Sequence, residues 1–175
     1  MALLRTALVL AALALAAHWA WRQPFMERPR TAWTLSRMPP PARLPVPVDG
    51  VPARRIADTF GAPRGSDRRH AGVDIFAPRG TAVRAATLGI VSAIRDGGLG
   101  GKQVWLIGPA WERHYYAHLD AWTDTLTVGQ VVQPGSVLGS VGNTGNARTT
   151  PPHLHYAIYG KHGAYDPLPL LQAGR

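Results

Sequence analysis

After Gly50 the chain alternates short apolar runs with turns rich in glycine and proline. Runs of this length that contain β-branched and aromatic residues are typical of strands. No stretch beyond Gly50 keeps a helical period for long enough to predict a full-length helix. The segments predicted to be strands are Val73–Ile75, Ala82–Ala85, Gly89–Ile94, Gln103–Ile107, His114–His118, Ser136–Val141 and Leu154–Tyr159. The pattern therefore predicts an all-β domain over residues 51–175, a compact antiparallel sheet or sandwich with a central groove.

A largely apolar segment occupies residues 6–21. Its length lies between that of a signal-peptide core and that of a full membrane span. Ala14-Leu15-Ala16 resembles a small-residue cleavage site, whereas Trp19 and Trp21 favour retention at a membrane interface. We expect residues 1–21 to form a hydrophobic helix that is a signal peptide or, slightly favoured, a membrane anchor. Either form is exported and places the domain in the periplasm or cell envelope.

Proline is concentrated between these two parts of the chain. Seven of the sixteen prolines lie between Pro24 and Pro47, whereas all nineteen glycines lie at or after Gly50. Residues 22–50 show no sustained helical or strand period. We therefore expect a Pro-rich linker that is stiff, extended in a polyproline-like conformation and poorly packed against its neighbours.

The chain has a formal net charge of +9, and residues 22–69 hold most of it, with ten arginines against four acidic residues. Such a segment is attracted to anionic lipid headgroups or anionic wall polymers. Nucleic acid is not expected as a partner, because the sequence has no recognised nucleic-acid motif and export would separate the domain from DNA. The chain has no cysteine, so a metal site must use imidazole and carboxylate groups.

Histidines recur on the predicted strands or just before them, at spacings that place them on shared faces if the segments are extended. In an extended segment His153 and His155 project from one face, and His70 and Asp74 share a face in the same way. Together His70, Asp74 and His155 supply three nitrogen or oxygen ligands, the number that a catalytic zinc site uses when it keeps a fourth position for water. His118 and His153 remain for proton transfer. An isolated His-x-His pair is more often one solvated and one packed histidine, so the prediction depends on the whole set.

Three motifs occur in a fixed order along the domain: His-x-x-x-Asp at 70–74, Tyr-x-His-Leu at 116–119 and His-Leu-His-Tyr at 153–156. Together with Val141-Gly142-Asn143-Thr144-Gly145, they resemble the lysostaphin-like (LytM-type) zinc metallopeptidases, which cut peptide bonds in bacterial peptidoglycan. The similarity extends over residues 56–167.

This resemblance implies a zinc-dependent endopeptidase for cell-wall remodelling, whose substrates are the peptides of peptidoglycan. It implies that Zn²⁺ is held by His70, Asp74 and His155, while His118 and His153 transfer protons. One alternative is a non-catalytic wall-binding module that recruits or activates another peptidoglycan hydrolase, although such relatives lack ligands that are intact here. Another is a latent enzyme whose groove is covered by the proline-rich segment.

Residues near these motifs give further predictions about the groove. Tyr116 shares strand parity with His118 and is expected to reach the groove; His114 has the same parity, but the family pattern selects His118. Gly97–Lys102 is expected to be a hairpin connection and a mobile wall of the groove, because it lacks the spacing of a phosphate-binding loop. The loop Asn143–Asn146 is expected to border the groove and to orient the substrate backbone.

Overall fold

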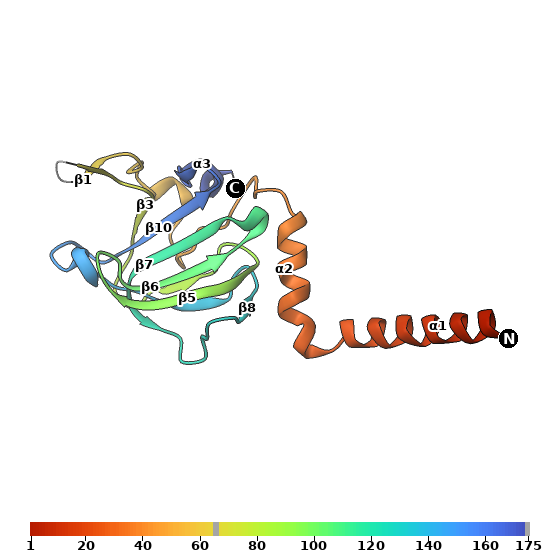
Figure 1. Ribbon diagram of the computed structural model, residues 1–175. Helices are drawn as coiled ribbons and strands as arrows, with labels where there is room; N and C mark the ends of the chain where they lie inside the picture. The colour runs from red at the N-terminus through yellow and green to blue at the C-terminus, as the bar shows by residue number, and fades with distance from the viewer. Residues whose placement is uncertain (65–66, 174–175) are drawn as a thin grey trace.

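A computed structural model of the chain describes residues 1–64 and 67–173, and Figure 1 shows a twisted sheet with two helices leading into it. The α-helices are α1 (Ala2–Trp21), α2 (Glu27–Arg37) and α3 (Leu168–Gln172). The short 3-10 helices are η1 (Pro24–Met26), η2 (Ala53–Arg55), η3 (Pro109–Trp111) and η4 (Gly145–Ala147). The strands are β1 (Pro63–Arg64), β2 (Arg68–Arg69), β3 (Val73–Phe76), β4 (Ala82–Arg84), β5 (Gly89–Gly97), β6 (Gly101–Ile107), β7 (Arg113–Trp122), β8 (Val131–Val132), β9 (Val137–Val141), β10 (His153–Gly160) and β11 (Gly163–Tyr165).

One nine-stranded sheet makes up most of the domain. Its main path runs β11-β10-β7-β6-β5-β8, with β3 paired to β10, and β9 paired to both β4 and β7. Its described strand pairs are antiparallel. The all-β prediction is therefore confirmed, and each predicted strand overlaps an observed one. The strands β1, β2, β8 and β11 escaped prediction because they have only two or three residues each.

The strand β10 lies between β3 and β7 and fixes the relative position of all three. His155 is directly opposite Asp74 on β3 and directly opposite Ala117 on β7. Alternation along β10 then sends Leu154 and Tyr156 into the core, where both are fully buried. His153 and His155 therefore project from the other face, as the sequence predicts.

A bulge in β7 changes which of its side chains face away from the core. Between Tyr116 and Leu119, three steps along β7 are paired with two steps along β6. His118 lies within the bulge at a φ of 63°, a left-handed conformation that few residues other than glycine adopt. Tyr116 and Leu119 consequently both point into the core and are fully buried. The prediction that Tyr116 reaches the groove is wrong, because strand parity is lost at the bulge.

The chain before the sheet is helical where the sequence predicts an extended linker. Glu27–Arg37 forms α2, and Pro29 is tolerated because it lies in the first turn, where the backbone N–H has no helical acceptor. Leu35 is completely buried, and α2 contacts η3, β5 and β8. Further along, Leu44 and Val48 are also buried in the core. The predicted polyproline-like conformation is therefore wrong for residues 27–37, and the predicted poor packing is wrong for Leu35, Leu44 and Val48.

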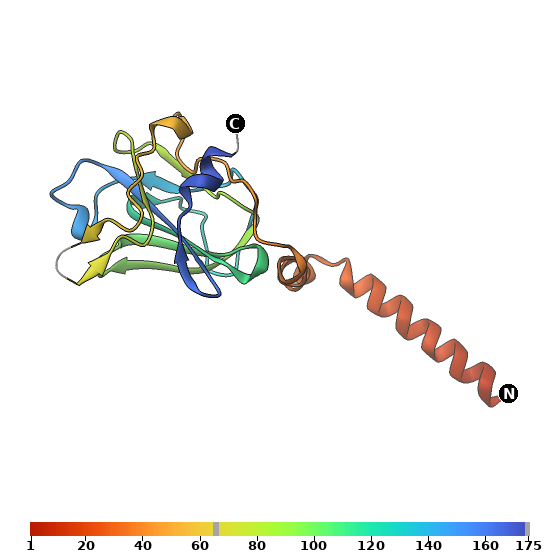
Figure 2. The same ribbon diagram turned by 90° about the horizontal axis from the view of Figure 1, so that it is seen from above.

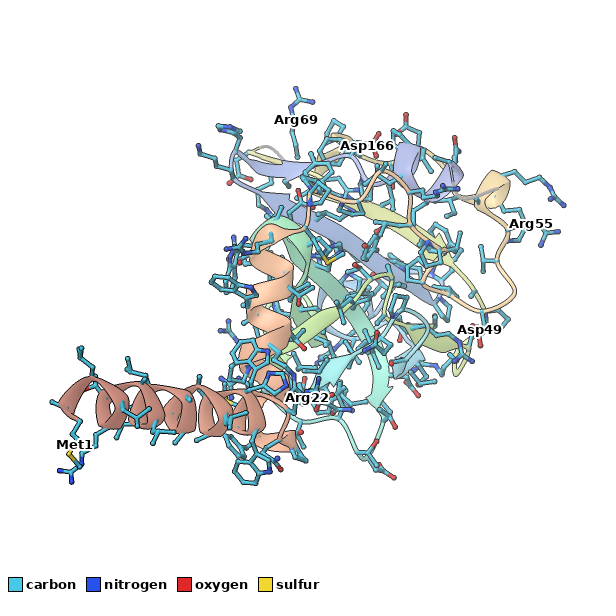
Figure 3. All side chains as sticks on the ribbon, turned by 90° about the vertical axis from the view of Figure 1, so that its right-hand side faces the viewer. Met1, Arg22, Asp49, Arg55, Arg69 and Asp166 are labelled. Atoms are coloured by element: carbon cyan, nitrogen blue, oxygen red, sulfur yellow. The ribbon has the colours of Figure 1, made fainter. Side chains whose placement is uncertain are left out.

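The first helix, α1, contributes nothing to the core of the domain. None of its twenty residues, all of which the structure describes, is buried. It is long and apolar enough to cross a membrane, a property that signal sequences share. Figures 1 and 2 show it extending away from the sheet, and Figure 3 places Met1 at its far end.

His114 is part of the core and not of the groove. Its side chain is fully buried, and its Nδ1 lies 2.7 Å from the hydroxyl oxygen of Tyr156. Its Nε2 has no hydrogen-bond partner among the residues that the structure describes. Burial disfavours the charged imidazole and lowers the pKa of His114 to about 4.

This buried imidazole should make stability depend on pH. In the unfolded chain the imidazole takes up a proton near its ordinary pKa of about 6.5, whereas in the folded chain it stays neutral down to about pH 4. The unfolded state therefore binds more protons in this window, and stability falls as the pH falls. Urea unfolding should show the wild type losing about 3 kcal/mol relative to His114→Phe between pH 6.5 and pH 4. The exposed His162→Phe should keep the wild-type pH dependence, and parallel curves for wild type and His114→Phe would contradict the assignment.

Candidate metal centre

A groove with a volume of about 440 Å³ lies over β3, β7 and β10. All five residues predicted for the site line it: His70, Asp74, His118, His153 and His155. Further lining comes from the β1–β2 ribbon, the connection between β5 and β6, the segment around η4, and side chains of β6, β7 and β10. None of the described lining residues comes from residues 22–50, so the proline-rich segment does not cover this groove.

Three donor atoms converge on the floor of the groove. His70 Nε2 lies 2.8 Å from His155 Nδ1 and 3.0 Å from Asp74 Oδ1. His155 Nδ1 lies 3.1 Å from the same oxygen of Asp74. These three residues form a group that could hold a metal ion. Donor atoms about 2.0–2.1 Å from a tetrahedral Zn²⁺ are about 3.3 Å apart, so small side-chain rotations suffice to accommodate an ion.

Contacts behind the donor atoms orient two of the three side chains. His70 Nδ1 donates to the carbonyl oxygen of Thr59 at 2.7 Å, which leaves the lone pair of His70 Nε2 available. The backbone N–H of Asp74 donates to the Thr59 hydroxyl at 3.1 Å. The other carboxylate oxygen of Asp74, Oδ2, accepts a hydrogen bond from Arg64. Thr59 and Arg64 lie outside the sequence motifs, so spacing alone gave no signal for them.

The electrostatics of Asp74 favour a charged carboxylate. Burial by itself raises the pKa of Asp74, but hydrogen bonds and charge interactions with His155 and His70 outweigh burial and hold the pKa well below its ordinary value. Burial also lowers the pKa of His155, against the effect of Asp74. A carboxylate and a neutral imidazole are the protonation states that a metal ion requires of these ligands.

His118 and His153 lie beside the three donors without belonging to the triangle. Their rings are 5.1 Å apart, and the His118 ring is 5.8 Å from that of His155. His118 Nδ1 donates to the carbonyl oxygen of Thr144 at 2.9 Å, and His153 Nδ1 donates to that of Pro151 at 2.8 Å. Each histidine thus keeps Nε2 for the groove. Burial, followed by the neighbouring histidines, lowers the pKa of His118 to about 4.

The aromatic lining of the groove differs from the one predicted. Tyr115, Trp105 and Tyr159 line it in place of Tyr116, and the rings of Trp105 and Tyr115 stack with centroids 4.1 Å apart. These residues lie on neighbouring strands β6, β7 and β10. On β7 the bulge at His118 accounts for the difference, because Tyr115 and Ala117 face the groove while Tyr116 faces the core.

Both predicted loops reach the groove. Gly97 pairs with Gly101 at the end of a β5–β6 hairpin, which confirms the hairpin, and Leu99 lines the groove. From the other loop, Asn146 lines the groove. Gly101 has a φ of 58°, and a Cβ there would collide with the backbone of Gly145, so the two loops meet only because position 101 is glycine. Loop mobility and contact with substrate remain predictions.

The sequence of the chain matches a known protein family. The sequence model described as Peptidase family M23 matches residues 68–167. An L-Ala–D-Glu endopeptidase of Bacillus subtilis is 37% identical over 126 residues, which cover 66% of this chain and 39% of that protein. Lysostaphin of Staphylococcus simulans is 36% identical over 110 residues, covering 59% of this chain and 22% of that protein. The match therefore covers well under half the length of these relatives.

Solved structures show the same relationship. The catalytic domain of lysostaphin from Staphylococcus simulans has a TM-score of 0.60 and 32% identity, covering 67% of this chain and 92% of that one. Csd3 of Helicobacter pylori has a TM-score of 0.57 and 30% identity, covering 73% of this chain and 34% of that one.

Fold and site together define an antiparallel β domain with a His-Asp-His cluster, suited to metal binding, on the floor of an open groove. The chain belongs to peptidase family M23. The resemblance seen in its motifs is thereby confirmed.

The donor triangle predicts how metal binding responds to substitution. Purified protein should bind one divalent metal ion per chain in elemental analysis and titration calorimetry. Asp74→Ala and His155→Ala should each weaken metal binding by more than about 100-fold, because each removes a donor atom. Loss of a residue that only hydrogen-bonds to a metal ligand costs up to about 100-fold. His118→Ala is the matched control and should keep the ion, since its ring lies outside the triangle. Near-stoichiometric metal in His155→Ala would refute the ligand assignment.

Proposed function

We propose that this chain is a zinc-dependent endopeptidase that hydrolyses peptide bonds in bacterial peptidoglycan. The observation that carries the proposal is the convergence of three donor atoms, none more than 3.1 Å from the others, on the floor of an open groove that holds two further histidines. The named relatives support it, because one is an L-Ala–D-Glu endopeptidase and another is lysostaphin.

The donor set favours zinc over the common alternatives. Two imidazoles and one carboxylate suit a borderline-soft ion that accepts tetrahedral geometry. Magnesium and calcium prefer six or more oxygen ligands, which this cluster does not offer. The residues that would hold the ion are His70 through Nε2, Asp74 through Oδ1 and His155 through Nδ1. When bound, zinc supplies a Lewis acid that polarises the scissile carbonyl and lowers the pKa of water.

The remaining chemistry belongs to His118 and His153. Because each donates its Nδ1 hydrogen to a backbone carbonyl, each Nε2 is a proton acceptor in the neutral ring. The lowered pKa keeps His118 neutral at pH 7, so it can take a proton from the attacking water. Once protonated, the pair stabilises the developing oxyanion and donates the proton to the leaving amine.

The alternative, a non-catalytic wall-binding module, is disfavoured by the same geometry. A binding module has no need for converging donor atoms or for buried histidines with oriented rings beside them. It remains distinguishable by experiment, because such a module would bind peptidoglycan and increase the activity of another hydrolase without releasing peptides itself.

We further propose that the protein is exported and held at the membrane by α1. The helix spans twenty residues with high hydropathy and has no contact that would bury it in the domain. An uncleaved anchor would keep the groove close to the membrane, and wall remodelling near the membrane suits that position.

Purified peptidoglycan tests the activity. Incubation with the metal-loaded protein should release soluble peptides, identified by mass spectrometry, and a chelator should abolish the release. His118→Ala should lose activity by at least about 100-fold while keeping its metal, because general acid–base groups contribute at this level. Metal-loaded wild-type protein that binds peptidoglycan but releases nothing would favour the binding module instead.

Membrane fractionation tests the anchor. The full-length chain, expressed in a bacterial host, should remain in the membrane fraction after carbonate and salt washes, with the intact mass of residues 1–175. The double variant Leu8→Arg with Leu10→Arg should be lost from that fraction, since each arginine near the centre of a span costs about 2.5–3.5 kcal/mol. A wild-type chain that begins after Ala16 and is recovered in the soluble fraction would show that the segment is a cleaved signal.

A further inference from the structure

The helix α2 has two faces of different character. Leu35 is fully buried on the face that packs against the sheet domain. Positions two apart in an α-helix are about 200° apart, so Trp33 and Arg37 lie on the face opposite Leu35. Trp33 is 56% exposed, and the Arg37 guanidinium lies 4.1 Å from the centre of its ring. A tryptophan beside an arginine is typical of a helix at a membrane–water interface, where one end of each side chain is apolar and the other polar.

The end of α1 is attached to this same face. Arg30 precedes Trp33 by three positions and therefore lies on the same side of α2. Its guanidinium donates to the carbonyl oxygens of Trp21 and Gln23, the second at 3.2 Å. These carbonyls lie at the C-terminal end of α1, where a cation is favoured by the unpaired carbonyls and the helix dipole. The turn between the two helices is thus held by specific contacts.

The two helices run crosswise. Figure 1 shows α1 leaving the lower end of α2 away from the domain, and Figure 2, in which α2 is seen end-on, shows the same departure. A bilayer crossed by α1 would therefore run along the length of α2, on the side opposite the sheet. Residues 22–37 contain four arginines and one glutamate, a charge that favours anionic lipid headgroups.

We propose that the face of α2 formed by Arg30, Trp33 and Arg37 lies in the headgroup layer of an anionic phospholipid bilayer. The proposal rests on the proposed membrane insertion of α1. The occupant of this face is a lipid surface for three reasons. The face continues from α1, the only described helix that is long and apolar enough to span a membrane. The face also carries excess positive charge and exposes an aromatic ring. The domain then contacts the bilayer through α2, and this contact restricts its orientation relative to the membrane.

The absence of cysteine makes a direct test available. Single cysteines carrying a nitroxide spin label are placed at Thr34 beside the docking face, at Ala12 in α1 and at Leu99 on the groove. The full chain is reconstituted in vesicles of phosphatidylcholine with and without phosphatidylglycerol. Accessibility to oxygen and to a water-soluble nickel chelate then reports the depth of each label.

The label at position 34 should be shielded from the nickel chelate relative to position 99, and more so with phosphatidylglycerol. Trp33→Gln or Arg37→Gln should return position 34 to the accessibility seen at position 99. Arg55→Gln is the matched control, because Figure 3 places Arg55 on the side of the domain away from α2, and it should change nothing.

The outcomes separate this proposal from the anchor. If position 12 lies in the bilayer while position 34 is as accessible as position 99, the anchor stands and the docking of α2 is refuted. If position 12 is accessible from water, both the membrane anchor and the docking of α2 are refuted. Shielding of position 34 by a wall polymer or a protein would then be looked for in samples without lipid. If shielding does not depend on Trp33 or Arg37, the residues of the docking face are wrongly assigned.

Discussion

The pairing of β10 with β3 and β7 is the constraint on which the site depends. Backbone hydrogen bonds hold His155 opposite Asp74 on one side and opposite Ala117 on the other. Side chains alternate strictly along a strand, so a slip of one residue would exchange His155 with Leu154 and put an imidazole into the core. The buried side chains of Leu154 and Tyr156 oppose such a slip. The donor atom that His155 contributes to the proposed metal site is therefore positioned by packing on the opposite face of the same strand.

The same logic explains how far the sequence predicts the site. Alternation along unbroken strands is enough to place His153, His155 and Asp74 correctly, and the order of the motifs supplies His70 and His118. The logic fails at Tyr116 because β7 contains one extra residue, and a bulge is a property of strand pairing that a single sequence does not reveal. Positive φ is uncommon for any residue other than glycine, and although histidine is among those enriched there, a single histidine does not mark the break in the strand.

The bulge itself contributes to the groove. His118 donates its backbone N–H to the carbonyl of Gly100 at 2.9 Å and its ring Nδ1–H to the carbonyl of Thr144 at 2.9 Å. One residue is thereby tied to both loops that border the groove. A left-handed conformation is costly for a residue with a side chain, and it persists where surrounding contacts over-determine it. In this domain those contacts also fix the direction in which the imidazole points.

The N-terminal region could not be predicted in the same way. Glu27–Arg37 is polar, contains Pro29 and buries only Leu35, so its hydrophobic pattern is too weak to predict a helix. Contacts with the sheet domain supply the stability that the pattern lacks, which is the usual source of helix stability in proteins.

This difference changes the reach of the protein. An extended linker of residues 22–50 would let the groove explore tens of ångströms at about 3.1 Å per residue. Because α2, Leu44 and Val48 pack on the sheet domain, this part of the chain does not extend the distance between the groove and α1. In Figure 1, β1 lies at the opposite end of the domain from α2, and Arg64 of β1 lines the groove. A domain of about 125 residues has a radius of gyration of about 14 Å, so the groove of an anchored protein would work roughly one domain diameter from the bilayer. Any substrate of the anchored protein would then have to come within that distance of the bilayer.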